Sequence, residues 1–180
     1  MVYILLKPGF EEIEALSAGD ILRRGGVEVQ FAGIGSRSVT GGNGITLQAD
    51  CLVEEMNLEA MELIMLPGGM GGVRSILGSD CALQAVTYAH EHGKFVTAIC
   101  AAPTVLAKLH ITDGKQATVY PGMEEQMGSA VMKDINAVQD GKLITGRAPG
   151  AAFDFGYLLL EALKGREAAL KVRMGMVYNH

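Results

Sequence analysis

The residue best placed for covalent chemistry is Cys100, which directly follows the apolar segment 95–99 and precedes the small residues Ala101-Ala102-Pro103. This pattern predicts a buried strand, a tight turn and the start of a helix. A thiol in such a turn lies at the carboxyl end of the sheet, where open α/β sheets bind ligands. The positive end of the helix dipole favours the thiolate, so we expect a lowered Cys100 pKa and a nucleophilic sulfur. The alternative is that Cys100 is simply a small buried hydrophobe.

Two further features have the residue types needed to act with that thiol. Gly68-Gly69 directly follow the apolar segment 63–66, and glycine N–H groups in such a turn can point at a developing oxyanion. Glu14 lies in the first turn of an expected helix, again at the carboxyl edge of the sheet, where a carboxyl group can transfer protons. Each feature also has a simpler interpretation. The glycines would then form a plain turn, and Glu14 would only stabilise a helix start.

The elements that must position these residues alternate between strands and helices. Short apolar runs bounded by glycine, proline or charged residues predict strands, whereas helical periodicity with acidic starts and basic or glycine ends predicts helices. The expected strands are 2–6, 27–31, 63–66, 95–99, 116–120 and 143–145, and the expected helices are 11–24, 80–92, 101–109, 153–163 and 166–172. A small hairpin is expected between residues 33 and 50. This order predicts one α/β domain over residues 1–180, with a mostly parallel sheet covered by helices on both faces.

The composition narrows the possible partners. The chain has 15 Lys+Arg against 20 Asp+Glu, a net charge of −5, so we expect no nucleic-acid partner. No apolar run approaches the roughly 20 residues that span a bilayer, and the N-terminus lacks a signal-peptide pattern, so we expect no membrane partner and a cytoplasmic location. Three cysteines are too few for a disulfide framework. The histidines lack ligand spacing, so we expect no metal and no other cofactor.

Several motifs, taken together and in this order, resemble the ThiJ/PfpI superfamily. More narrowly, they resemble the branch that holds bacterial ThiJ-like proteins and the human Parkinson-associated deglycase. The motifs extend along the whole chain and are Gly9-Phe10-Glu11-Glu12-Ile13-Glu14, Arg23-Arg24-Gly25-Gly26-Val27, Leu66-Pro67-Gly68-Gly69, Ile99-Cys100-Ala101-Ala102-Pro103 and Thr145-Gly146-Arg147-Ala148-Pro149-Gly150. The resemblance implies a flavodoxin-like three-layer sandwich, similar to class I glutamine amidotransferases, and a homodimer.

The resemblance also implies roles for individual residues. Cys100 would be the reactive thiolate and Glu14 its partner, and the N–H groups of Gly69 and Ala101 would form the oxyanion hole. The expected substrate pocket is completed by Gly68, Ala102, Tyr120 and Arg24. Members of this branch are described as glutathione-independent glyoxalases, as deglycases of early glycation adducts and as oxidative-stress sensors. The expected partners are therefore small reactive aldehydes or glycated groups.

The sequence departs from the family pattern at Tyr120, where many members carry histidine. A tyrosine hydroxyl, with an ordinary pKa of about 10, is a poor general base at neutral pH. This disfavours an intracellular cysteine peptidase, which would need a Cys-His dyad. It leaves glyoxalase or deglycase chemistry, in which Cys100 attacks an aldehyde and Glu14 moves a proton, the pair sharing one proton. The alternative is a non-catalytic oxidative-stress sensor or chaperone-like dimer in which Cys100 is oxidised.

Overall fold

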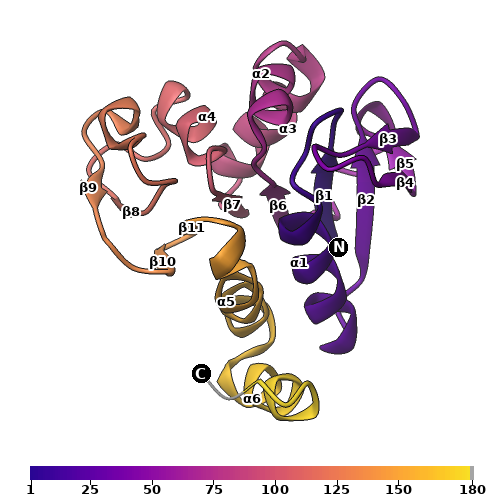
Figure 1. Ribbon diagram of the computed structural model, residues 1–180, viewed down its shortest axis with the longest axis vertical. Helices are drawn as coiled ribbons and strands as arrows, with labels where there is room; N and C mark the ends of the chain where they lie inside the picture. Colours follow the sequence, from indigo (N-terminus) through magenta and orange to yellow (C-terminus); the bar gives the residue numbers. More distant parts are fainter. Residues whose placement is uncertain (179–180) are drawn as a thin grey trace.

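The computed structural model describes residues 1–178, apart from the side chain of Met70, and its centre is a seven-stranded sheet in the order β10-β11-β7-β6-β1-β2-β5 (Figure 1). Every neighbouring pair in this sheet is parallel except β10 and β11, which are antiparallel. Its strands are β1 (Val2–Leu6), β2 (Val29–Gly33), β5 (Cys51–Leu52), β6 (Leu63–Leu66), β7 (Phe95–Ile99), β10 (Ala137–Asp140) and β11 (Leu143–Gly146). Two smaller sheets pair β3 (Ser38–Thr40) with β4 (Thr46–Gln48) and β8 (Gln116–Ala117) with β9 (Val131–Met132).

Charge and capping signals mark the ends of some of the helices, most clearly those of the first and the third. The helices are α1 (Glu12–Arg24), α2 (Met70–Leu77), α3 (Asp80–Glu91), α4 (Pro103–Lys108), α5 (Ala152–Lys164) and α6 (Arg166–Gly175), with 3-10 turns at Val53–Glu55, Glu124–Met127 and Pro149–Ala151. The first turn of α1 is acidic and its last turn is basic, as the helix dipole favours. Ser79 caps α3 by accepting a hydrogen bond from the Ala82 N–H at 3.4 Å.

The connections place helices on both faces of the sheet. From β1 to β2 the chain moves toward one edge, whereas from β6 to β7 it moves toward the other. Because such crossovers are right-handed, α1 and α3 lie on opposite faces. Helix α5 packs beside α1, and α6 packs against α5 (Figure 1). The predicted α/β sandwich is therefore confirmed. The direction of travel reverses between β1 and β6, which is where open α/β sheets form ligand-binding crevices.

The central strands are buried along their whole length. Every residue of β1, β6 and β7 is buried, which explains why these segments are almost entirely apolar rather than alternating. The one polar residue is Thr97 in β7, whose hydroxyl donates to the Ile64 carbonyl at 3.0 Å. One hydrophobic cluster extends from Val2 to Ala169 and joins both faces of the sheet. Within residues 1–178, no helix combines the length and the apolar character that crossing a bilayer requires.

Several local expectations differ from the structure. The strand expected at 116–120 ends at Ala117 and lies outside the main sheet, because the backbone beyond it bends so that the Tyr120 N–H donates to the Cys100 carbonyl at 2.8 Å. Helix α2 and strand β10 were not expected. Helix α2 begins in a glycine-rich segment, and β10 is a short, partly exposed strand whose residues carry no clear alternation. The expected hairpin is β3–β4, which forms its own sheet rather than an edge of the central one.

Candidate active site

Three parallel strands that end at one edge of the sheet bring the candidate residues together. Strand β1 leads to Glu14 in α1, β6 leads to Gly68, and β7 leads to Cys100. Because β6 pairs with both β1 and β7, the carboxyl ends of the three strands are adjacent. The packing is tight: a Cβ atom added at Gly68 would lie 2.7 Å from the Cβ of Cys100 and 3.0 Å from Oε2 of Glu14. Residues 86 positions apart in the chain therefore form one site.

Cys100 occupies a constrained turn. Its φ angle of 64° lies in the left-handed region, which costs a non-glycine residue roughly 1–2 kcal/mol. Hydrogen bonds hold both of its peptide groups: its N–H donates to the Gly146 carbonyl at 2.9 Å, and its carbonyl accepts from the Tyr120 N–H at 2.8 Å. The Ala102 N–H donates to the Ile99 carbonyl at 3.1 Å and closes the turn. The surrounding backbone thus fixes the direction of the thiol.

The glycine turn supplies hydrogen-bond donors to both reactive groups. The Gly68 N–H donates to Oε2 of Glu14 at 2.7 Å. The N–H groups of Gly69 and Ala101 donate to the sulfur of Cys100. Gly69 has a φ angle of 86°, and a Cβ atom there would lie 2.2 Å from the Gly9 carbonyl oxygen, so only glycine fits. Two N–H groups from separate loops therefore converge on the sulfur, where they can also stabilise negative charge on an adjoining oxygen.

Glu14 is a buried carboxyl group with one free oxygen. Its side chain is fully inaccessible to solvent, and burial raises its pKa to about 7, although hydrogen bonds with the Gly68 N–H and the Cys100 thiol act to lower that pKa. Among residues 1–178, no group meets the full geometry of a hydrogen bond to Oε1. The Cys100 sulfur is the reactive group beside it. A carboxyl group with a pKa close to neutrality is suited to giving and taking protons.

The pKa of Cys100 shifts in the direction opposite to the one expected from the sequence. Burial and the negative charge of Glu14 raise it to about 12, and the N–H groups of Ala101 and Gly69 offset only part of this. The sequence argument considered the helix start and not the burial, which leaves only 8% of Cys100 exposed. Taken together, the pair loses its first proton near pH 7 and holds the second to about pH 12. At neutral pH, a Cys100 thiolate therefore requires that Glu14 hold the proton.

A cavity of about 310 Å³ opens beside this pair. Its lining residues are Glu11, Gly69, Cys100, Ala101, Tyr120, Met123 and Pro149. Its volume is at the small end of the range for ligand pockets, so a small molecule fits it best. Glu11 was not among the predicted site residues, yet it lines this cavity. Burial, followed by the charge of Glu12, raises its pKa. The position of Glu11 one helical turn before Glu14 was the available sequence signal.

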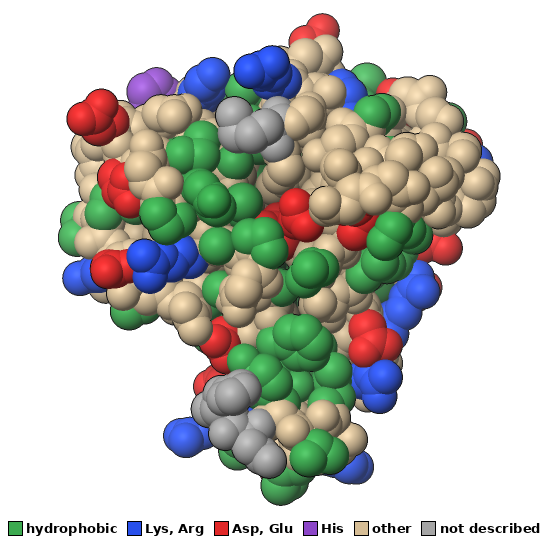
Figure 2. All heavy atoms as spheres, in the orientation of Figure 1, with side chains coloured by type: hydrophobic (Ala, Val, Ile, Leu, Met, Phe, Trp, Pro, Cys, Tyr) green, Lys and Arg blue, Asp and Glu red, His purple; other side chains and the backbone are tan. Residues whose placement is uncertain are grey.

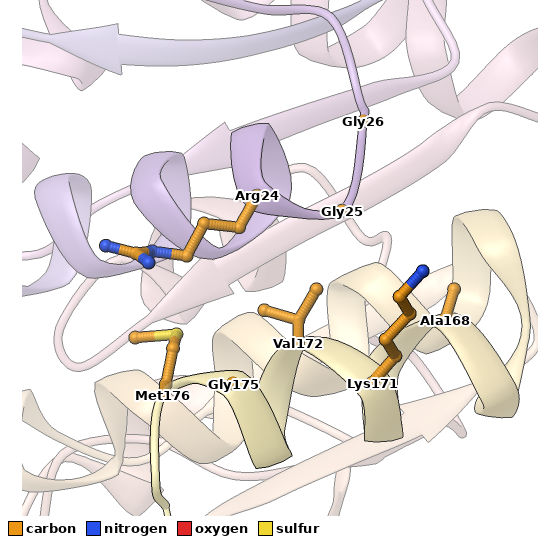
Figure 3. A pocket seen from close by; sticks show the side chains of 8 residues that line it. All are labelled: Arg24, Gly25, Gly26, Ala168, Lys171, Val172, Gly175 and Met176. Carbon is orange, nitrogen blue, oxygen red and sulfur yellow. The ribbon is translucent and has the colours of Figure 1, made fainter.

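The remaining predicted pocket residues lie elsewhere. Gly68 and Ala102 lie next to Cys100 but do not line the cavity. Ala102 is fully buried. Arg24 was predicted to lie in the substrate pocket, but it does not line the cavity beside Cys100. It lies at the opposite end of α1, ten residues and about 15 Å of helix from Glu14. There it pairs with Asp20 at 2.6 Å and faces a separate cavity between α1 and α6 (Figure 3).

Glu12 has a structural task that the sequence did not reveal. It is almost fully buried, and its oxygens accept hydrogen bonds from the Asn43 N–H at 2.8 Å, the Asn43 side chain at 2.9 Å and the Ile45 N–H at 3.3 Å. Glu12 therefore ties the β3–β4 loop to the start of α1 instead of capping the helix. Within residues 1–178, no group of three or more His, Cys, Asp or Glu side chains lies close enough to hold a metal ion.

The fold and this site define an α/β protein whose reactive cysteine occupies a strand-to-helix turn beside a carboxyl partner. Residues 1–162 match the model of the DJ-1/PfpI family, and the chain belongs to that family. The DJ-1beta protein of Drosophila melanogaster is 35% identical over 177 residues, covering 97% of this chain and 95% of the relative. Its crystal structure superposes with a TM-score of 0.94 at 34% identity, covering 99% of this chain and 98% of that chain. The resemblance inferred from the motifs is thereby confirmed.

Two further relatives are relevant to function. A Caenorhabditis elegans protein named as a glutathione-independent glyoxalase is 32% identical over 171 residues, covering 91% of this chain and 89% of the relative. A structure described as oxidized DJ-1 of Toxoplasma gondii superposes with a TM-score of 0.94 at 30% identity, covering 99% and 98% of the two chains. Glyoxalase-type activity and an oxidised form are thus named among proteins similar to this one.

Proposed function

We propose that this protein is a cysteine-dependent enzyme of the glyoxalase or deglycase type. It would act on small reactive aldehydes such as methylglyoxal, or on glycated groups, through Cys100 and Glu14. The observation that carries the proposal is geometric: the buried Glu14 carboxyl group lies beside the Cys100 thiol, with two converging N–H groups and a small cavity next to the sulfur. The name of the Caenorhabditis elegans relative supports the same chemistry.

The proposed reaction begins with the proton on Glu14 and the negative charge on the Cys100 sulfur. The sulfur attacks the aldehyde carbon, and the carbonyl oxygen takes up negative charge, which the Gly69 and Ala101 N–H groups stabilise. Glu14 gives its proton to that oxygen and a hemithioacetal forms. The Glu14 carboxylate then removes the proton from the former aldehyde carbon and returns it to the adjacent carbon. The proton of the hemithioacetal hydroxyl passes to the former ketone oxygen, and a thioester of the hydroxy acid is left. Water releases the hydroxy acid and restores the sulfur.

The test measures conversion of methylglyoxal to lactate by the wild type and by matched variants. Cys100→Ser should abolish turnover, and Glu14→Gln should lower it by roughly 10²- to 10⁴-fold, the usual contribution of a general acid–base group. Cys81→Ser provides the control, because Cys81 is an exposed thiol outside the cavity. Lactate formation by Cys100→Ser at the wild-type rate would contradict the proposal.

A second candidate function is oxidative-stress sensing, with or without chaperone-like activity. The same three donors that surround the sulfur, two N–H groups and a protonated Glu14, are suited to the oxygens of a sulfinic acid. The oxidised form named for the Toxoplasma gondii relative supports this alternative. It predicts that dilute peroxide adds two oxygens to Cys100, seen by peptide mass, in a protein that produces no lactate. Lactate production by the reduced protein would favour the enzyme instead.

We also propose a cytoplasmic homodimer that associates through the face formed by α1 and α5. Hydrophobic side chains gather over that region in Figure 2, and Ile13, Leu16 and Phe153 are 53%, 37% and 37% exposed. Light scattering at micromolar concentration should give twice the mass of the chain. The Ile13→Glu variant should give a mass closer to that of a single chain. The three free cysteines suit a reducing compartment, which cell fractionation would test.

A further inference from the structure

The cavity beside Cys100 contains a carboxyl group that the proposed reaction does not use. Glu11 is one of its seven lining residues, and none of the seven is a lysine, an arginine or a histidine. The buried Glu14 carboxyl group beside the Cys100 thiol adds a second acid next to the cavity. A molecule that reaches the sulfur therefore approaches two acids and no lining cation.

The charge of Glu11 acts on the site and is not neutralised. Among residues 1–178, no lysine, arginine or histidine forms an ion pair with Glu11. Its Oε1 accepts a hydrogen bond from the side-chain amide of Asn43 at 3.2 Å, which is a neutral donor. Burial is the main cause of the raised Glu14 pKa, and the negative charge of Glu11 is a smaller one. The Glu11 charge thus reaches the reactive pair.

The two cations closest along the chain to the lining residues are directed elsewhere. Lys7 follows β1 and donates to the Ser75 carbonyl. Arg147 follows β11, pairs with Asp134 at 2.7 Å and lines a separate cavity. Neither lines the cavity beside Cys100, so neither balances the negative charge there.

Structural roles account poorly for the Glu11 carboxyl group. Glu11 directly precedes α1, but its side chain makes no capping hydrogen bond. The β3–β4 loop is already held by Glu12, whose contacts with Asn43 at 2.8 and 2.9 Å are shorter than the one made by Glu11. Burial and the charge of Glu12 raise the pKa of Glu11 despite its Asn43 hydrogen bond, so its surroundings disfavour the ionised form. This points to a role in the site rather than in stability.

We infer that Glu11 is a specificity-determining residue that makes the Cys100 cavity accept neutral and cationic carbonyl compounds and discriminate against anionic ones. A carboxylate or phosphate group on an aldehyde would enter a small volume beside two acids, where like charges repel more strongly than in open water. A neutral α-oxoaldehyde is not repelled, and a glycated amine that keeps its proton is attracted. The substrate class rests on the proposed function, whereas the charge selection can be measured on the thiol alone.

The first test compares two alkylating reagents that differ in charge and little in shape. Iodoacetamide is neutral and iodoacetate carries one negative charge, and peptide mass gives the labelling rate of each cysteine. Both reagents consume the same thiolate, so a change in thiol pKa cancels from the ratio of the iodoacetamide rate to the iodoacetate rate. In the wild type, this ratio should be higher at Cys100 than at the exposed thiol Cys81. An equal or lower ratio at Cys100 would overturn the inference.

Variants assign the effect to the charge of Glu11. Glu11→Gln should lower the Cys100 ratio roughly tenfold, the effect of removing one charge about 6 Å from the reagent's carboxylate at an effective dielectric constant of about 40. Glu11→Asp keeps the charge and should retain most of the preference. Glu167→Gln is the matched control, because it removes the same charge from an exposed position on α6. An unchanged ratio in Glu11→Gln, or an equal fall in Glu11→Asp or Glu167→Gln, would overturn the inference.

The second test extends the comparison to turnover. The compounds para-carbamoylphenylglyoxal and para-carboxyphenylglyoxal have nearly the same shape and differ by one charge. The wild type should convert the amide with the higher kcat/KM, and Glu11→Gln should narrow the difference. A wild-type preference for the carboxylate would overturn the inference. Failure to convert either compound would contradict the proposed function alone, because the alkylation ratio would still decide the charge selection.

Discussion

Replacing Glu14 by Gln separates the two roles of this residue, hydrogen bonding and proton transfer. In the wild type, the pair loses its first proton near pH 7, where the pKa of Glu14 lies because of its burial. A reactive thiolate can appear at that step only if the remaining proton resides on Glu14. We therefore expect alkylation of Cys100 to rise with pH with a midpoint at or below about 7, under the ordinary thiol value of about 8.5.

The size of the change in the Glu14→Gln variant follows from the contacts. The substitution removes the Glu14 charge that, after burial, does most to hold the Cys100 pKa at about 12. It also replaces a carboxyl donor to the thiolate by a weaker amide donor. A hydrogen bond to a charged group contributes about 1.5–3 kcal/mol, and the amide recovers part of this. The remaining loss of about 1 kcal/mol raises the midpoint by roughly one pH unit, to about 8.

The assay measures iodoacetamide labelling of each cysteine by peptide mass between about pH 5 and pH 10, with methylglyoxal turnover measured on the same samples. The exposed thiol Cys81 is the internal reference. Glu11→Gln is the matched variant, because Glu11 lines the same cavity but does not pair with the sulfur. Its charge makes the smallest of the contributions to the Glu14 pKa, so its loss should lower the midpoint only slightly. Wild-type labelling that rises only above about pH 9, or a Glu14→Gln midpoint above about 10, would refute the shared-proton reasoning.

Three further predictions concern the backbone and the neighbouring acid. Cys100→Gly should be roughly 1 kcal/mol more stable than Cys100→Ala in urea unfolding, because φ is 64°; equal stabilities would contradict the strain. Gly68→Ala should destabilise the fold by about 1–3 kcal/mol and suppress Cys100 labelling, because its Cβ would lie 2.7 Å from that of Cys100; wild-type labelling would argue against this packing. Burial acts to raise the Glu12 pKa, but the Asn43 hydrogen bonds keep it below its ordinary value of 4.5. Stability should therefore fall as pH decreases through that lowered pKa, and Glu12→Gln should abolish this acid-side loss in pH-dependent unfolding.

The sequence was sufficient to predict the central strands, the turn at Cys100 and the arrangement of the sheet. Strands β1, β6 and β7 are buried on both faces, so their residues are apolar apart from Thr97, and each strand ends at residues that mark turns. In a parallel sheet, the residues that follow adjacent strands must meet at one edge. The sequence placed Glu14, Gly68 and Cys100 after such strands, and the family resemblance implied that they act together. The adjacency of β1, β6 and β7 is a property of the strand order in the folded sheet.

Other features depended on contacts between segments that are distant in the sequence. Glu12 and Asn43 meet only because the β3–β4 loop folds back over the start of α1, and Glu11 faces the cavity for the same kind of reason. Arg24 appeared beside the site in the motif pattern, but the length of α1 carries it to the other end of the helix. Local residue patterns contain no information about these distances.

The protonation state of the site is the clearest case that the tertiary structure alone decided. The sequence placed Cys100 at a helix start, and the positive end of a helix by itself lowers a thiol pKa. The direction changes because the fold removes both Cys100 and Glu14 from water and holds two acids against each other, so that burial and repulsion exceed the effect of the backbone N–H groups. Burial and charge separation are properties of three-dimensional packing, which residue types and spacing along the chain cannot specify.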